Sequence, residues 1–424
     1  MKIAFVTQPW DDVVPVLGGS TSISILTYQI AQRLAQSGNE IILYGKGSGL
    51  QQKTERDDNG IEYRRISVDL ETRLLKPLRA LERLLGHPNP KRPLFASRVY
   101  YLGYILQVAR DLRREKCDII HLHNFSQFVQ VVRAISPKSK IVLQMHCEWL
   151  SQLDRSLIEK RLRQVDLVVG CSEYITEKIR QRFPQFASRC KTITSGVDVN
   201  QFASKSNHRE KNMDRPKRLL FVGRISPEKG VHVLLEAFQQ VVKSYPNVEL
   251  ELVGGQQAAP YEFIVLVDDD YKVSGLASFY NGRSKRGNYI PYLKEHTPSN
   301  LAAKVIFSGP ISQSDLVNHY CNADVLINPS LSEAFGLSLI EAMACKVPVI
   351  GTRIGGMLET VEDGRTGILV ERDDPSELSR AILDLLADED LRKSMGEAGR
   401  QRAVEHFSWD RIVERLSKLY GSIL

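Results

Sequence analysis

Two carboxylates, Glu333 and Glu341, stand eight residues apart in the second half of the chain. The apolar run 325–328 predicts a buried strand that breaks at Pro329, and apolar residues recur at helical spacing after Gly336. Eight residues rise about 12 Å along a helix, so the two acids cannot act on one atom. They could instead hold the two ends of one elongated ligand.

The backbone between the two acids suits an anion. Phe335, Gly336 and Leu337 open the predicted helix, and the N–H groups at a helix start carry partial positive charge. A sugar, a diphosphate and a ribose in line would fit between the two carboxylates. A helix with surface acids after a turn is the plainer interpretation.

A second pair of reactive side chains, Arg224 and Lys229, lies five residues apart after the predicted strand 218–223. A guanidinium fork and an ammonium together suit a diphosphate. They matter most when negative charge builds on the diphosphate as it departs. Cations on an exposed loop would be the alternative.

Both stretches resemble the retaining glycosyltransferases of family four, which have the GT-B fold. Glu333 and Glu341 match the family's E-x7-E element, and the string 222–230 is similar to its V-G-R-x-x-x-x-K-G element. The flanking Pro348 and the glycines 355–356 match as well.

The resemblance implies a role for each of these residues. Glu333 and the amides of residues 335–337 would contact the donor sugar, Glu341 would bind the ribose, and Ile311 would lie against the base. The resemblance also implies a reaction in which Arg224, Lys229 and the amides of Gly19 and Gly336 stabilise the departing diphosphate.

In the first half of the chain, several glycines and polar residues lie in or directly after predicted strands. Gly18 and Gly19 follow the strand 2–7, where missing Cβ atoms let a backbone approach phosphate. His121 and His123 are two residues apart in the predicted strand that ends before residue 124, so they lie on the same face of the sheet. By resemblance, His123 lies beside the donor sugar and His121 is structural, and the loop with His146 and Glu148 faces the acceptor. Cys147 and Glu148 depart from the family's commoner pattern there.

The pattern of strands and helices predicts an α/β protein. The resemblance implies the GT-B fold, in which two Rossmann-like domains with parallel sheets face each other across a cleft. We expect an acceptor-binding domain over 1–200, a nucleotide-sugar-binding domain over 201–405, and a helix over 406–424 that returns to the first domain. The segment 256–300 is longer than the family's usual helix. Its run 268–270 is similar to a D-x-D metal motif, but no second ligand cluster accompanies it.

The composition is ordinary for a soluble globular protein, with 42% hydrophobic and 25% charged residues in 424. No apolar run reaches the roughly 18–20 residues of a membrane span, and the start of the chain reads as a strand rather than a signal peptide. The six cysteines are scattered, which favours free thiols in a reducing cytoplasm.

The net charge of +7 is unevenly distributed. Between Glu71 and Lys116 there are eleven Lys or Arg residues against four acids, with leucines interleaved. This stretch could press on anionic lipid, which would place the protein on the inner face of the membrane. A solvated helix that packs its leucines on the core is an equal alternative. No recognition motif supports nucleic-acid binding.

The resemblance implies transfer of a hexosyl group from a nucleotide diphosphate sugar, a UDP-sugar by preference, to a hydroxyl acceptor with retained configuration. A bacterial surface polysaccharide or glycolipid is the acceptor class that the resemblance implies, and no metal or other cofactor is expected. A nucleotide-sugar epimerase of the same fold and a non-catalytic sugar-nucleotide-binding protein are the alternatives. A dehydrogenase is disfavoured, because no G-x-G-x-x-G turn follows the first strand.

Overall fold

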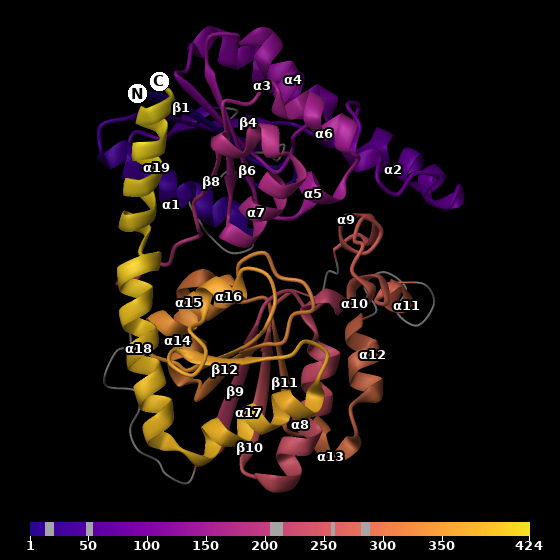
Figure 1. Cartoon of the computed structure of the whole chain (residues 1–424), viewed down its shortest axis with the longest axis vertical. Helices are drawn as coiled ribbons and strands as arrows, with labels where there is room; N and C mark the ends of the chain where they lie inside the picture. Colours follow the sequence, from indigo (N-terminus) through magenta and orange to yellow (C-terminus); the bar gives the residue numbers. More distant parts are fainter. Residues whose placement is uncertain (13–20, 48–53, 204–214, 256–258, 281–288) are drawn as a thin grey trace. The chain divides into compact units, whose positions relative to one another are not determined.

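The computed structural model describes residues 1–12, 21–47, 54–203, 215–255, 259–280 and 289–424. It divides into a first unit, Met1–Thr194 with Asp410–Leu424, and a second unit, Ser195–Trp409. Each unit holds a sheet of mostly or wholly parallel strands with helices packed beside it (Figure 1). The predicted α/β fold with two Rossmann-like domains is therefore confirmed.

The sheet of the first unit has the strand order β3-β4-β2-β1-β5-β6-β7-β8. All neighbours are parallel except β3 and β4. The order reverses between β1 and β5, and open α/β sheets bind ligands beside such a switch point, beyond the carboxyl ends of the strands. The strands are β1 Lys2–Val6, β2 Glu40–Lys46, β3 Thr54–Arg56, β4 Glu62–Ile66, β5 Ile119–His123, β6 Lys140–Met145, β7 Leu167–Gly170 and β8 Cys190–Thr192.

The helices of the first unit begin with side-chain caps where the sequence offers them. Thr21 accepts the backbone N–H of Ser24 at the start of α1, and Ser172 accepts that of Ile175 at the start of α7. The helices are α1 Ser22–Gln36, α2 Asp69–Leu84, α3 Leu102–Glu115, α4 Phe128–Ile135, α5 Trp149–Gln152, α6 Arg155–Leu162, α7 Glu173–Arg182 and α19 Trp409–Ile423, with the short 3₁₀ helices η1 Leu94–Ala96 and η2 Pro184–Arg189.

The sheet of the second unit has the order β11-β10-β9-β12-β13-β14, and every pair is parallel. Its switch point lies between β9 and β12. The loops after these two strands are those that carry Arg224, Lys229 and Glu333. The strands are β9 Lys217–Val222, β10 Val248–Val253, β11 Val305–Gly309, β12 Val325–Asn328, β13 Val349–Thr352 and β14 Gly367–Val370.

A buried apolar core joins this second sheet to helices α8 and α17, with Leu219, Phe238 and Ile382 among its members. Across the described ranges, no helix combines the length and apolar character that a membrane crossing needs. The helices of the second unit are η3 Pro227–Lys229, α8 Val231–Ser244, α9 Tyr261–Ile264, α10 Tyr271–Ser274, α11 Ala277–Tyr280, α12 Tyr289–His296, α13 Ser299–Ala302, α14 Gln313–Asn322, α15 Leu337–Ala344, α16 Met357–Thr360, α17 Pro375–Ala387 and α18 Glu389–Phe407.

Candidate active site

The loops after β9 and β12 touch each other because glycines allow a close approach. Gly230 has φ +67°, and a Cβ there would lie 2.1 Å from the carbonyl oxygen of Pro329. A Cβ on Gly356 would lie 2.3 Å from the carbonyl oxygen of Ala334. Side chains at either position would push the loops apart, so these glycines hold the Glu333 loop against its neighbours.

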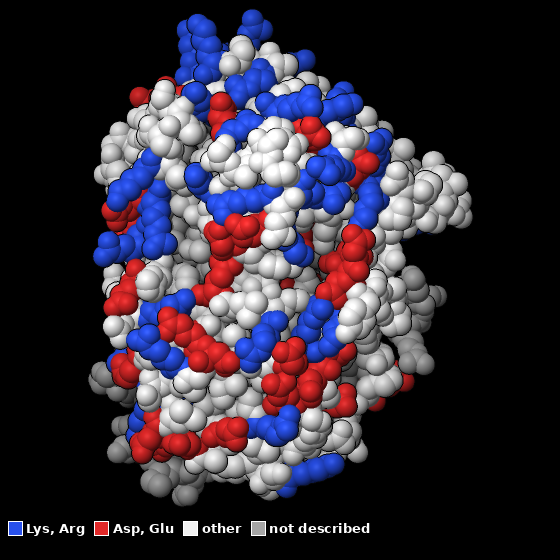
Figure 2. All heavy atoms as spheres, in the orientation of Figure 1, with Lys and Arg blue, Asp and Glu red and all other residues white. Residues whose placement is uncertain are grey.

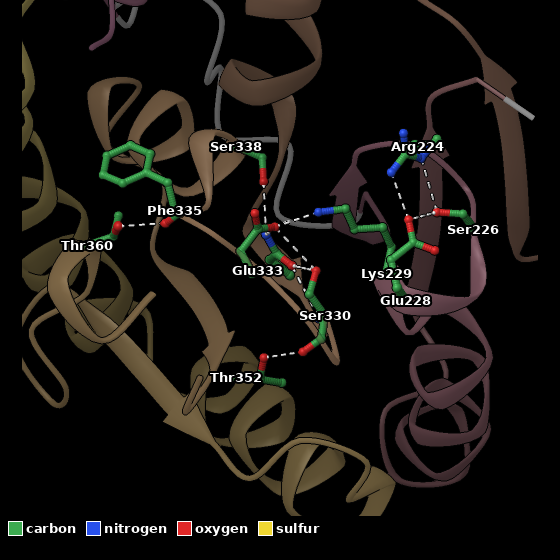
Figure 3. Close-up of polar contacts among 11 residues, drawn as sticks. Arg224, Ser226, Glu228, Lys229, Ser330, Glu333, Phe335, Ser338, Thr352 and Thr360 are labelled. Carbon is green, nitrogen blue, oxygen red and sulfur yellow. Dashed lines mark hydrogen bonds and ion pairs between the residues drawn. The ribbon is translucent and has the colours of Figure 1, made fainter. Parts of the chain in front are cut away.

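Lys229 and Glu333 form an ion pair between these two loops, with 2.7 Å between Nζ and Oε2 (Figure 3). The side chains are 21% and 13% exposed. Asn328 Nδ2 and Ser330 Oγ each lie 3.5 Å from the same carboxylate oxygen. Burial opposes ionisation, but Lys229, Asn328 and the backbone N–H of Phe335 hold the pKa of Glu333 below its ordinary value. Glu333 is therefore a carboxylate at neutral pH.

Arg224 pairs with a different acid on its own loop. Its Nη2 donates to Glu228 Oε1 at 2.8 Å, and its Nε donates to Ser226 Oγ at 3.3 Å (Figure 3). Glu228 is buried, and although burial opposes its ionisation, Arg224 and Ser226 help to hold the pKa of this carboxyl low. The Arg224 side chain is 43% exposed. It can therefore keep Glu228 as a partner while its remaining N–H groups meet an anion.

Helix α15 begins directly after the Glu333 turn. Gly336 precedes it with φ +92°, and Leu337 is its first residue. The ring of Phe335 packs against Phe407, with ring centroids 5.8 Å apart, and its carbonyl accepts from Thr360 Oγ1. The side chain of Phe335 thus serves packing, while the backbone N–H groups at the helix start provide the anion-binding character.

Glu341 lies within α15 and is buried. Its Oε2 accepts from the hydroxyl of Tyr320 at 2.7 Å. Burial raises the pKa of Glu341 to about 7, and the Tyr320 hydroxyl acts in the opposite direction. Tyr320, on α14, has no motif in the sequence that would have identified it. Ile311, expected beside the base, follows β11 and is half-buried, and its role stays a prediction.

In the first unit, His123 ends β5 with both ring nitrogens bonded. Its Nε2 lies 3.2 Å from Thr27 Oγ1, and its Nδ1 lies 3.0 Å from His146 Nε2. Because the Thr27 hydroxyl donates to the carbonyl of Ile23, it accepts from His123, and His123 Nδ1 in turn accepts from His146. Burial lowers the pKa of His146 to about 4 and that of His123 well below its usual value. Both rings are neutral at physiological pH.

The sequence predicted a structural role for His121. It is buried, and its Nδ1 lies 2.6 Å from the hydroxyl of Tyr420 on α19. His123 is buried too, whereas His146 is half-buried. A direct sugar contact by His123 therefore stays a prediction, and the geometry assigns it a second task, which is to orient His146.

A polar network beside these histidines was missed by the sequence analysis. The buried carboxyl of Asp11 accepts from Gln8 Nε2 at 3.1 Å and from Thr21 Oγ1 at 2.8 Å. Gln8 Oε1 accepts from Asn124 Nδ2, and Asn124 Oδ1 accepts from the backbone N–H of His146. Burial raises the pKa of Asp11 to about 6. The available signal was position, since Gln8 and Asn124 follow the two strands at the switch point.

Two further expectations concern the first unit. Glu148 accepts from the hydroxyl of Tyr174 at 2.9 Å and forms an ion pair with Lys178, so its carboxylate already has partners on α7. Gly18 and Gly19 lie outside the described residues. The acceptor contacts of His146 and Glu148 and the phosphate contacts of the two glycines stay predictions.

The long segment after β10 folds into α9, α10 and α11 and packs on the Glu333 loop. Val265 and Leu276 are buried against Leu331, two residues before Glu333. Arg372 links the same parts, because it pairs with Asp270 Oδ2 at 2.5 Å and donates to the carbonyl of Leu331 at 3.2 Å. Asp270, part of the D-x-D-like run, also accepts the backbone N–H of Lys272 at the start of α10.

The second unit thus gathers a paired lysine and glutamate, an arginine with exposed N–H groups and a helix start at its switch point. This arrangement can bind a diphosphate beside a group with hydroxyls, with the cations on the diphosphate and the carboxylate on the hydroxyls. Glu341 offers a second carboxyl along the same helix for a further hydroxyl-bearing group.

Comparisons with known proteins agree with this chemistry. Residues 204–402 match the family model "Glycosyl transferases group 1", and residues 23–201 match the model "Glycosyltransferase Family 4". The chain is 28% identical over 331 residues to the putative glycosyltransferase YtcC of Bacillus subtilis, a stretch that covers 75% of each chain.

Two solved structures show the same fold along the whole chain. Sucrose-phosphate synthase from Thermosynechococcus elongatus superimposes with a TM-score of 0.75 at 23% identity, covering 100% of this chain and 99% of that one. Anabaena Alr3699/HepE, solved with UDP and glucose, gives a TM-score of 0.68 at 18% identity, with 100% of both chains covered. At these identities the likeness establishes the fold alone.

Proposed function

Because the chain belongs to the group 1 glycosyltransferases and has the GT-B fold, we propose that it transfers a hexosyl group from a UDP-sugar to a hydroxyl acceptor and retains the anomeric configuration. The observation that carries the proposal is the Lys229–Glu333 ion pair beside Arg224 at the switch point of the second sheet. UDP is preferred because a protein of the same fold was solved with UDP and glucose.

The positive groups act on the leaving diphosphate. When the bond between the sugar C1 and the phosphate oxygen breaks, negative charge builds on the diphosphate. This charge is stabilised by Lys229, by the exposed N–H groups of Arg224 and by the backbone N–H groups at the start of α15. They stabilise the transition state more than the ground state, which is the condition for raising kcat.

The two acids hold the ends of the donor. Glu333, ionised and next to Lys229, accepts hydrogen bonds from sugar hydroxyls. Glu341 accepts from the ribose hydroxyls. In the proposed step the acceptor oxygen attacks C1 from the face that the diphosphate leaves, and its proton passes to the departing phosphate oxygen. Bonds and charge then balance without a protein base, and Glu333 can remain ionised throughout.

The proposal includes no metal, since Arg224 and Lys229 supply the positive charge at the diphosphate. Transfer rates in excess EDTA should equal those with added Mg²⁺. The acceptor class we propose is a surface polysaccharide or a glycolipid precursor assembled in the cytoplasm.

A panel of UDP-, GDP- and ADP-sugars tests the proposal, scored for hydrolysis and for the rise in melting temperature. We expect UDP-sugars to give the largest rise in melting temperature and to be hydrolysed slowly. Proton NMR should show that the first-formed sugar has the same configuration at C1, axial or equatorial, as the donor. Conversion of the donor sugar into an epimer, without hydrolysis and without an acceptor, would indicate an epimerase. Tight binding with neither hydrolysis nor transfer would indicate a binding protein, and either result would contradict the proposal.

UDP binding should depend on pH through Glu341. The carboxyl pKa is about 7 in the free protein, and the ionised form is a stronger acceptor for a ribose hydroxyl than the protonated form. Affinity should therefore fall as the pH drops through about 7, by up to about tenfold per unit. Isothermal titration calorimetry from about pH 5.5 to about pH 8.5, which brackets the carboxyl pKa, measures this dependence of UDP affinity.

Two variants distinguish the pH dependence that comes from Glu341 from the pH dependence that comes from the titration of UDP itself. Glu341→Gln should bind more weakly at high pH and lose the protein's part of the pH dependence. Tyr320→Phe removes the hydroxyl that opposes the rise in pKa, so the midpoint should move to higher pH. An unchanged profile in Glu341→Gln would place the ribose elsewhere.

The α9–α11 segment should affect catalysis through the Glu333 loop. Asp270→Asn weakens the hold on Arg372 and thereby on Leu331. We expect kcat/KM to fall about threefold to tenfold, while the free energy of unfolding changes by less than about 1 kcal/mol because the ion pair is partly exposed. Steady-state kinetics and urea denaturation measure the two quantities. Glu389→Gln, which breaks an exposed ion pair on α18, is the control and should leave kcat/KM unchanged.

A further inference from the structure

Helix α2 in the first unit exposes a continuous stripe of leucines. Only Leu75 among its residues is buried. The exposed leucines of α2 and of the next residue are between 44% and 84% accessible: Leu70, Leu74, Leu78, Leu81, Leu84 and Leu85. At 3.6 residues per turn these six positions span an arc of about 120°. The sequence alternative in which the leucines pack on the core is therefore wrong for all of them except Leu75.

Polar contacts beside the Leu78 edge of the stripe hold this orientation. The carboxylate of Glu71 accepts the backbone N–H groups of Gly103 and Tyr104 at 2.6 and 2.7 Å, at the start of α3. Glu82 accepts the backbone N–H of Leu94 at 2.6 Å. The helix is thus fixed by its acids, and its apolar side is left to face outward.

The same arrangement sorts the charges. Glu71 and Glu82 are turned toward the rest of the unit, whereas Arg73 and Lys76 are exposed. On a helical projection, Arg73 falls about 20° beyond one edge of the leucine stripe, and Lys76 lies about 60° further round on the same side. Figure 2 shows the projecting end of α2 as a largely uncharged surface, with Lys and Arg side chains between it and the rest of the first unit.

We propose that α2 docks on a lipid bilayer of negative surface charge, with the leucine stripe (Leu70, Leu74, Leu78, Leu81, Leu84, Leu85) entering the interface and Arg73 and Lys76 contacting the lipid headgroups. An apolar arc with cations along the polar face beside it is the pattern of helices that lie in a membrane interface. The anionic headgroups attract the cations, and the leucines leave water on insertion.

A bilayer fits this surface better than a second copy of the chain. A second copy joined through the stripe would offer these cations only the carboxylates of Glu71 and Glu82, which already accept backbone N–H groups. An anionic bilayer instead complements the cations. The proposal deepens the proposed function, because an enzyme held at the bilayer can meet acceptors carried on lipid, but the docking itself is independent of transfer.

Vesicle co-sedimentation tests the proposal without donor or acceptor. Vesicles of phosphatidylcholine alone are compared with vesicles that also contain phosphatidylglycerol, at low and at high salt. We expect the wild-type chain to bind the anionic vesicles at least about tenfold more tightly, and this preference to weaken as salt screens the charges. Equal or absent binding to both vesicle types at low salt would overturn the proposal.

Two double variants separate the contributions. Leu74→Gln with Leu81→Gln should lower the partition onto anionic vesicles at least about tenfold, and Arg73→Gln with Lys76→Gln should bring it to the level of the neutral vesicles. Val404→Gln and Lys393→Gln change an exposed apolar and an exposed basic residue of α18 and should bind like wild type. Donor hydrolysis in solution should stay at the wild-type rate in all variants, which shows that they fold.

Analytical ultracentrifugation decides between the bilayer and a second copy. We expect a sedimentation coefficient that is the same for wild type and for the leucine double variant. The proposal would be overturned if the wild-type protein were a dimer and the leucine double variant a monomer. Unchanged vesicle binding by that variant would overturn it as well. Because no sugar nucleotide is present, failure here leaves the proposed transfer reaction standing, and loss of transfer in a correctly docked protein would count against the reaction alone.

Discussion

Replacing Lys229 by methionine should lower kcat for transfer about 100- to 1000-fold. The ammonium lies 2.7 Å from Glu333 and is the cation that we place on the leaving diphosphate. Removing one preorganised group that stabilises developing negative charge typically costs a factor of this size. The donor KM should change much less, because the charge on the diphosphate grows in the transition state. Steady-state kinetics with a UDP-sugar measure both constants.

The same substitution leaves the carboxylate of Glu333 without its main partner. We therefore expect a loss of about 1–3 kcal/mol in the free energy of unfolding, and a rise in the pKa of Glu333. The double variant Lys229→Met with Glu333→Gln should regain most of that stability, because no unpaired charge remains. It should not regain activity. A double variant that is both stable and active would show that the pair is structural.

Replacing Arg224 by alanine should lower kcat/KM about 100-fold or more. Arg224 has two tasks, because it holds the buried Glu228 at 2.8 Å and presents its other N–H groups to solvent. A guanidinium can do both at once, whereas an ammonium is a single point charge. Arg224→Lys should therefore regain only part of the lost kcat/KM.

A matched pair of variants on Glu228 tests the division of tasks. Glu228→Gln removes the acid but keeps the shape, so Arg224 remains charged and less tightly held. We expect a smaller fall in kcat/KM than in Arg224→Ala, and weaker donor binding. If Arg224→Lys had wild-type kcat/KM, the two tasks assigned to Arg224, holding Glu228 and contacting the diphosphate, would be contradicted.

The sequence predicted the parts of the site that depend on local pattern. Strands 218–223 and 325–328 were expected from their apolar runs, and the structure has them as β9 and β12. Since loops after neighbouring parallel strands meet at one edge of a sheet, Lys229 and Glu333 could be expected near one another. Their direct pairing could not, because it depends on the close approach at Gly230 and Gly356.

Contacts between distant segments were beyond the sequence. Tyr320 reaches Glu341 from another helix. Arg372 contacts both Asp270, 102 residues earlier in the chain, and Leu331, 41 residues earlier. Neither pairing follows from periodicity, because each depends on side-chain direction in the packed unit. The leucines of α2 gave the opposite difficulty: their spacing predicted an amphipathic helix, but only the anchoring of Glu71 and Glu82 determines which side faces out.

A crystal structure with an intact UDP-sugar, or with UDP and the free sugar, would show where the diphosphate binds. We expect diphosphate oxygens about 3 Å from Lys229 Nζ and from a guanidinium nitrogen of Arg224, a sugar hydroxyl on Glu333 and the ribose on Glu341. A diphosphate bound away from both cations, with the Lys229–Glu333 pair undisturbed and no sugar beside it, would contradict this expectation.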